Sequence, residues 1–178
     1  MLGTNGAGKT TLLRTIAGLL QPDAGAVRLN GADITTFPAD WRPGLGLAHV
    51  AGADSLAGPL TVDEHLRMFA LDLDGDELDA RLARTFEVFP RLAERHGQVV
   101  STLSGGEKQM LALAKAFVHR PDVLLVDEFS LGLAPVIVSE LIPIVAELNA
   151  EGTAVLLVEQ SVATALELAD RVLCIERG

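Results

Sequence analysis

The sequence has no apolar run long enough to cross a bilayer, and it is poor in cysteine and in basic residues. A membrane-spanning helix needs about 18 or more consecutive apolar residues, and no stretch here approaches that length. The single cysteine, Cys174, fits a reducing compartment, and we expect it to be buried on a strand. With 14 Lys and Arg against 24 Asp and Glu, the chain lacks the basic face that nucleic-acid binding requires.

What is present suits one ordered domain with a sizeable core, since 49% of the 178 residues are hydrophobic. Apolar strand patterns and amphipathic helix patterns alternate in the second half of the chain. This alternation predicts the α/β class, with a parallel sheet covered by helices. The expected strands are Val123–Val126, Ala154–Val158 and Val172–Ile175, and the expected helices are Pro135–Ala150 and Ser161–Leu168. Helical patterns between about 52 and 102 predict a helical subdomain inserted into this core.

A glycine-rich motif lies close to the N-terminus. The run Gly3-Thr4-Asn5-Gly6-Ala7-Gly8-Lys9-Thr10 matches the phosphate-loop pattern G-x-x-x-x-G-K-[ST], and apolar residues at helical spacing follow from Thr10 to Leu20. Thr11 is counted with this motif among the expected binding residues. The backbone N–H groups of such a loop wrap phosphates, so the motif predicts a nucleoside triphosphate site. Lys9 would reach the β- and γ-phosphates, and the Thr10 hydroxyl would bind Mg²⁺.

Two acidic residues directly follow one of the apolar expected strands. Asp127 and Glu128 come after Val123–Val126, and active groups of open α/β sheets lie at the carboxyl ends of strands. Asp127 would hold Mg²⁺, usually through water, while Glu128 would orient and activate the attacking water. In isolation, the two residues could equally be a polar strand end.

A third motif lies between these two, at Leu103-Ser104-Gly105-Gly106-Glu107-Lys108-Gln109. Ser104 and Glu107 form a capping-box pattern, which predicts a helix from Ser104 to His119. Gly105 and Gly106 leave the N–H groups of the first turn uncovered, and with the helix dipole these make an anion site. Taken alone, the run could be an ordinary glycine-rich helix start.

The order of the three motifs resembles that of ATP-binding cassette (ABC) ATPases, over nearly the whole chain. The stretch Ser130 to Pro135, the run Val158-Glu159-Gln160 and the stretch Leu60 to Leu66 resemble one branch, the ATP-binding subunits of branched-chain amino-acid importers. The resemblance implies a single ATP-binding domain over residues 1–178, with a phosphate-loop NTPase core. It also implies a cytoplasmic protein, peripheral on the inner face of the cell membrane.

The family resemblance implies a mechanism that needs a second ATPase subunit, identical or paralogous. Two cassettes pair head to tail, and each ATP lies between one subunit's phosphate loop and the other's signature. Ser104, Gly105 and Gly106 would therefore bind the partner's ATP. Hydrolysis would drive membrane permease subunits, which the helical subdomain contacts.

Several positions depart from the family pattern. Gly52 stands where these cassettes have glutamine or glutamate, and Phe129 replaces the usual proline after the hydrolytic glutamate. Gln160 occupies the position of the switch histidine, as the importer branch leads us to expect. The adenine-stacking aromatic residue would precede Met1, and the last expected strand lies close to the C-terminus. The sequence thus resembles a cassette that lacks both ends.

Two other interpretations remain open from the sequence. One is a degenerate or truncated cassette with little hydrolytic activity, which Gly52 favours and the intact Lys9, Asp127 and Glu128 oppose. The other is a soluble ABC ATPase of DNA repair or translation, although such proteins usually carry coiled-coil insertions or a second cassette. None of the four histidines occupies a motif position, and we expect all of them at the surface or at strand ends: His49, His65, His96 and His119.

Overall fold

The computed structural model describes residues 1–51, 56–70 and 73–176, and its contacts divide the chain into two compact units. The first unit comprises Met1–His49, Pro121–Ser130 and Thr153–Gly178, and the second comprises Val50–Arg120 and Leu131–Gly152. Gly52 lies outside the described residues. In the described part of the chain, no helix is both long and apolar enough to span a membrane.

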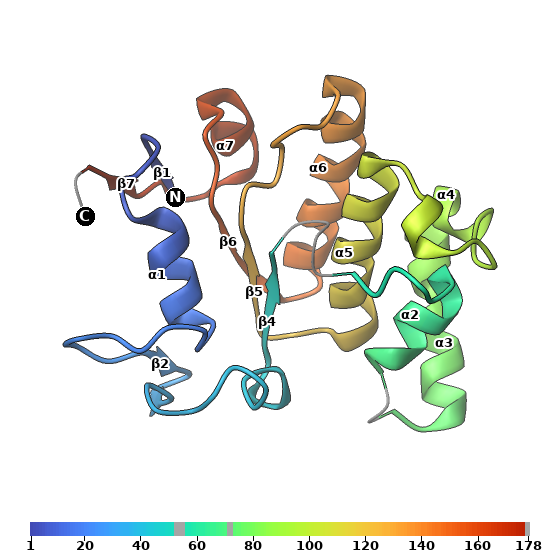
Figure 1. Cartoon of the computed structure of the whole chain (residues 1–178), viewed down its shortest axis with the longest axis horizontal. Coiled ribbons are helices and arrows are strands. Elements are labelled where there is room, and N and C mark those ends of the chain that lie inside the picture. Colours follow the sequence, from blue (N-terminus) through green and yellow to red (C-terminus); the bar gives the residue numbers. More distant parts are fainter. Residues whose placement is uncertain (52–55, 71–72, 177–178) are drawn as a thin grey trace. The chain divides into compact units, whose positions relative to one another are not determined.

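Short strands form the centre of the first unit (Figure 1). Strand β5 pairs in parallel with β6, β4 lies on the other side of β5, and β1 pairs in parallel with β7. This arrangement confirms the predicted parallel pairing. The strands are β1 (Leu2–Gly3), β4 (Leu47–Val50), β5 (Val123–Val126), β6 (Ala154–Leu157) and β7 (Cys174–Ile175).

Met1 connects the two sets of parallel strands. Its nitrogen donates a hydrogen bond to the Leu157 carbonyl, and its carbonyl accepts one from the Glu159 N–H at 3.1 Å. The chain just before the phosphate loop therefore lies beside the end of β6. As a result, the loops that follow β1, β5 and β6 leave the same edge of the sheet, where parallel strands end.

Helix α1 (Lys9–Ile16) and an antiparallel hairpin complete the packing of this unit around one apolar cluster. The hairpin strands β2 (Arg28–Leu29) and β3 (Ala32–Asp33) join through Asn30-Gly31, both at positive φ, as a tight two-residue turn requires. The cluster joins the inner face of α1 to the hairpin and the strands, so it fixes α1 against the sheet. Its buried members are Met1, Leu13, Ala17, Leu29, Ile34, Leu47, Leu125 and Val158.

Arg42 is a charged residue inside this unit, with only 1% of its surface exposed. Its guanidinium donates hydrogen bonds to backbone carbonyls at the end of α1 and in the segment after β3, and burial lowers its pKa. At Gly18 the backbone lies so close to the Arg42 guanidinium that a Cβ would clash with it, and the φ of 79° at this position also favours glycine. The carbonyl acceptors are Thr15, Ile16, Ile34, Thr35 and Phe37.

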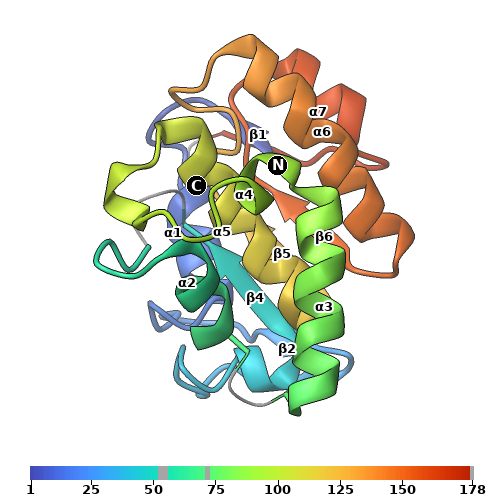
Figure 2. The same ribbon diagram turned by 90° about the vertical axis from the view of Figure 1, so that its right-hand side faces the viewer.

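The second unit is helical, and α5 lies at its centre (Figure 2). The helix α5 packs against α2, α3, α4 and α6, so the contacts group α5 and α6 with the helices of the expected insertion. The boundaries of that insertion, about 52–102, stay a prediction. The helices are α2 (Val62–Met68), α3 (Gly75–Val88), α4 (Pro90–Ala93), α5 (Gly105–His119) and α6 (Pro135–Ala150).

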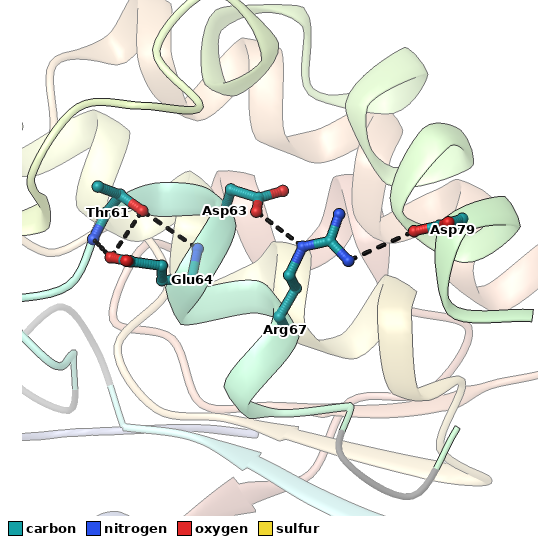
Figure 3. A network of polar contacts seen from close by, with 5 residues as sticks. All are labelled: Thr61, Asp63, Glu64, Arg67 and Asp79. Atoms are coloured by element: carbon teal, nitrogen blue, oxygen red, sulfur yellow. Dashed lines mark hydrogen bonds and ion pairs between the residues drawn. The ribbon is translucent and has the colours of Figure 1, made fainter. Parts of the chain in front are cut away.

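The start of α2 shows how local sequence determines a helix end (Figure 3). The Thr61 hydroxyl accepts a hydrogen bond from the Glu64 N–H at 3.2 Å, and the Glu64 carboxylate accepts one from the Thr61 N–H at 2.8 Å. Arg67 bonds Asp63 at 2.7 Å and Asp79 of α3 at 3.3 Å. These charges are largely exposed, so they contribute to α2–α3 orientation more than to stability.

Two expectations about burial are wrong. Cys174 lies on β7 as expected but is exposed, because β7 pairs only with β1 among the described strands. His65 is fully buried, and neither ring nitrogen has a hydrogen-bond partner among the described residues. Burial, assisted by the nearby Lys115 charge, lowers the pKa of His65 to about 4. Lys115 lies 4.4 Å from the Phe69 ring centroid, and burial lowers its pKa to about 8.

Candidate functional site

The glycine-rich motif folds as a turn that leads from β1 into α1. Gly6 has φ of 80° and Gly8 has φ of 97°, both in the left-handed region that favours glycine. The Ala7 N–H donates to the Thr4 carbonyl at 3.2 Å, and α1 begins directly after Gly8. The first-turn N–H groups of a helix have no intrahelical partner, so this turn presents an anion site.

Lys9 is folded onto the loop that contains it. Its side-chain nitrogen donates to the carbonyls of Gly3 at 2.8 Å and Thr4 at 3.0 Å, and the residue is only 6% exposed. Gly3 itself packs so closely against the Ile175 backbone that a Cβ would clash with the Ile175 carbonyl. The ammonium group is thus held within the loop whose N–H groups would wrap phosphates.

The structure brings together the two residues expected to hold a metal ion, although 117 positions separate them in the sequence. The Thr10 hydroxyl donates to the Asp127 carboxylate at 3.4 Å, because α1 starts and β5 ends at the same edge of the sheet. Both side chains supply the hard oxygen atoms that Mg²⁺ prefers, and Mg²⁺ completes its shell with water and phosphate oxygens. The described residues contain no cluster of three or more His, Cys, Asp or Glu able to hold a metal alone.

Glu128 has an unusual backbone conformation, with φ of 51°. Non-glycine residues rarely adopt this region, and such residues concentrate at functional sites. Its N–H donates to the Val158 carbonyl at 3.1 Å, so pairing with the neighbouring segment continues past the end of β5. Its carboxylate accepts a hydrogen bond from the Gln160 side chain at 3.2 Å. Phe129, where cassettes usually have proline, is fully buried.

Sequence reasoning gave no role to Glu159, although it belongs to the run Val158-Glu159-Gln160 that carries part of the resemblance. The side chain is 1% exposed and accepts hydrogen bonds from three backbone N–H groups, those of Ser130, Gln160 and Ser161. The signal that identified Asp127, an acid directly after an apolar strand, is present here too. Glu159 follows the apolar run Ala154–Val158.

The signature motif belongs to the second unit, where it starts α5 with the predicted capping box. The Ser104 hydroxyl accepts from the Glu107 N–H at 3.3 Å, and the Glu107 carboxylate accepts from the Ser104 N–H at 2.8 Å. A Cβ on Gly106 would lie 3.1 Å from the Ile137 side chain, whereas Gly105 faces open space. Gly106 therefore allows close packing of α5 on α6, and Gly105 leaves its own side of the first turn uncovered.

The Glu107 carboxylate also pairs with Arg95, whose Nε lies 2.5 Å away. Burial acts to raise the pKa of Glu107, but its bonds to Ser104 and the Arg95 charge outweigh this effect and hold the pKa below its usual range. The carboxylate is therefore ionised at neutral pH while it caps the helix.

Comparisons with known proteins show the family of the chain. Residues 1–130 match the family described as "ABC transporter". The chain is 41% identical to the high-affinity branched-chain amino acid transport ATP-binding protein BraG of Pseudomonas aeruginosa, over 100% of this chain and 76% of that protein. It is 37% identical to the probable branched-chain amino acid transport ATP-binding protein LivF of Archaeoglobus fulgidus, over 100% of this chain and 76% of that protein.

Solved structures show the same fold. A structure described as an ATP binding subunit of an ABC transporter matches with a TM-score of 0.87 and 33% identity, over 99% of this chain and 74% of that one. A structure of another ATP-binding cassette in its ADP conformation matches with a TM-score of 0.87 and 24% identity. The match covers 99% of this chain and 75% of that one. On this combined similarity in sequence and structure, the chain belongs to the ABC transporter family, as an ATP-binding cassette.

Proposed function

We propose that this ATPase energises the import of branched-chain amino acids or similar solutes through a membrane permease. The identity of 41% to BraG and 37% to LivF supports the solute class. The observation that carries the hydrolytic role is the contact between Thr10 and Asp127, with Glu128 next in the chain and bonded to Gln160. This arrangement favours an active ATPase over a degenerate cassette.

Each site residue then has a role that its surroundings support. The loop Gly3–Thr10, with Thr11 behind it, binds the triphosphate through backbone N–H groups, and Lys9 exchanges its carbonyl partners for the β- and γ-phosphates. Thr10 and Asp127 would hold Mg²⁺, which would supply positive charge to neutralise the phosphates. Glu128 orients the attacking water and accepts its proton. Gln160 holds the Glu128 carboxylate and, as a carboxamide, cannot itself take up a proton.

We further propose that the site is shared between two subunits. The uncovered first turn of α5, with Ser104, Gly105 and Gly106, is an anion site that would bind the γ-phosphate of ATP held by a second cassette. Stabilising the charge of the transition state needs donors on both sides of that phosphate. Family resemblance supports this pairing, either with an identical subunit or with a paralogue, and the docking of permease subunits onto the helical subdomain.

Lys9→Ala is expected to abolish the thermal stabilisation that Mg²⁺-ATP gives the wild-type chain. Ligand at 100 times its Kd stabilises a protein by about 2.7 kcal/mol, and loss of the ammonium removes its main charge contact with the phosphates. The measurement is the shift in melting temperature between ATP-free and ATP-saturated samples, so that any change in intrinsic stability cancels. Arg14→Ala removes an equal charge from an exposed position of α1 and should keep the shift. An undiminished shift in Lys9→Ala would remove the phosphate-loop assignment.

Specific ATPase activity is expected to rise with protein concentration, and Ser104→Arg is expected to cancel that rise. The arginine side chain would block the uncovered turn but leave ATP binding by the isolated subunit intact. Because Ser104→Arg also removes a helix cap, worth about 1 kcal/mol, Thr61→Arg is the control: it removes the same kind of cap from α2. Hydrolysis is assayed across concentration, alone and with a candidate partner cassette. High activity in a protein shown to be monomeric would contradict the shared site.

A further inference from the structure

Glu159 is a buried carboxylate that bonds to two loops at once. One of its oxygens accepts a hydrogen bond from the Ser130 N–H at 2.7 Å. The other accepts from the N–H groups of Gln160 at 2.8 Å and Ser161 at 3.0 Å. A carboxylate out of contact with water costs several kcal/mol unless its oxygens are satisfied, and here backbone amides satisfy both oxygens.

The two loops are those that carry the hydrolytic residues of the proposed function. Ser130 lies two positions after Glu128, in the loop that follows β5, and Gln160 lies in the loop that follows β6. Glu159 thus fixes the spacing of these loops just outside the strands that pair through Val126 and Leu157. Across that spacing the Gln160 side chain reaches the Glu128 carboxylate at 3.2 Å.

The chemistry of this bridge requires a carboxylate of this length. A glutamine would present N–H₂ on one side, where it would face either the Ser130 N–H or the two N–H groups of the other loop, donor against donor. An aspartate keeps the charge but is one methylene shorter, so it would reach only one of the loops. Glu128 stands at a positive φ, a conformation that persists only where its surroundings hold it.

We infer that Glu159 is a positioning residue for hydrolysis: its carboxylate holds the Glu128 and Gln160 loops in register, so that the Gln160 carboxamide keeps the Glu128 carboxylate aimed at the attacking water. This inference rests on the proposed role of Glu128. Misplacing a reacting group by about 1 Å can reduce a rate by about 100-fold, and loosening one loop would displace Glu128 without touching the phosphate loop.

The test is steady-state ATP hydrolysis by the full chain at saturating protein concentration, with kcat and KM separated. Glu159→Gln and Glu159→Asp are each expected to lower kcat by about 10- to 100-fold, with the ATP-dependent melting shift retained. Thr153→Val is the matched control. The Thr153 hydroxyl is also buried in the first unit and donates to the Pro121 carbonyl at 2.8 Å, but these residues precede β6 and β5, away from the site loops. Even if Thr153→Val lowers the melting temperature as much as the Glu159 variants do, its kcat should stay near that of the wild type.

A double-mutant cycle separates positioning from general loosening. If Glu159 acts through Gln160, then Glu159→Gln should lower kcat far less in a Gln160→Ala background than in the wild type. Wild-type kcat in both Glu159 variants, or full additivity with Gln160→Ala, would overturn the inference. If Glu159→Gln does not fold, the same two measurements, kcat and its additivity with Gln160→Ala, are made on Glu159→Asp, which keeps the charge. Wild-type turnover in Glu128→Gln would instead refute the proposed role of Glu128, independently of the Glu159 variants.

Discussion

Glu128→Gln should reduce ATP turnover by about 10²- to 10⁴-fold, the range for loss of a general base, while ATP remains bound. Glutamine keeps the size of the side chain and its capacity to bond Gln160, but it cannot accept the proton of the attacking water. The phosphate loop is not altered, so affinity for ATP should persist. On the shared-site proposal, ATP that is bound but not hydrolysed should hold two subunits together, and the variant should migrate as a dimer with ATP.

Single-turnover hydrolysis and size-exclusion chromatography with Mg²⁺-ATP measure these two effects. Glu167→Gln is the control, because it removes an equal charge from an exposed position of helix α7 (Val162–Leu168) in the same unit and should leave turnover unchanged. Hydrolysis at the wild-type rate in Glu128→Gln would assign the proton acceptor to another group.

The second large effect is on stability, and it concerns Arg42. Arg42→Met is expected to lower the free energy of unfolding by about 3–5 kcal/mol, because several backbone carbonyls lose a charged hydrogen-bond donor. The arginine donates to the carbonyls of five residues. Those of Thr15 and Ile34 also accept from the N–H groups of Gly18 and Phe37, so the main cost of methionine falls on the carbonyls of Ile16, Thr35 and Phe37, at about 1–3 kcal/mol for each one left unsatisfied. Two of these carbonyls end α1, so the helix behind the phosphate loop should loosen first.

Urea unfolding of the ATP-free chain measures this cost. Arg28→Met removes an arginine from an exposed position of β2 and should change stability by less than about 0.5 kcal/mol, the usual range for surface substitutions. Arg42→Lys should recover only part of the loss, because an ammonium cannot reproduce the planar fork of donors. Equal stability of Arg42→Met and the wild type would mean that water or backbone movement satisfies the carbonyls.

Local sequence signals predicted local structure well. The capping box at Ser104, the helix Pro135–Ala150 and the strand Val123–Val126 all occur as expected, because each depends on residues within a few positions of one another. The phosphate-loop glycines do have the positive φ values that the motif requires.

Features that depend on distant residues could not be predicted in the same way. The Thr10–Asp127 contact joins segments 117 positions apart, so its distance depends on how the fold brings them together. Arg42 and His65 appear as ordinary polar residues in the sequence, and only packing buries them. Glu128 has a left-handed conformation and bonds the Val158 carbonyl through its N–H, and neither feature has a sequence signature. Glu159 was missed because its partners are backbone N–H groups, which every residue has.

The pairing of Arg95 with Glu107 affects the electrostatic potential at the start of α5. A glutamate in the first turn of a helix is a good cap, but an unpaired one would repel a polyphosphate, and the repulsion grows as the surroundings become less polar. With Arg95 at 2.5 Å, the two charges present a dipole rather than a net negative charge. On the shared-site proposal, the nucleotide of a second subunit would then meet the partial positive charge of the N–H groups with the carboxylate's field largely cancelled. The acid that stabilises the helix need not oppose the closure of two cassettes.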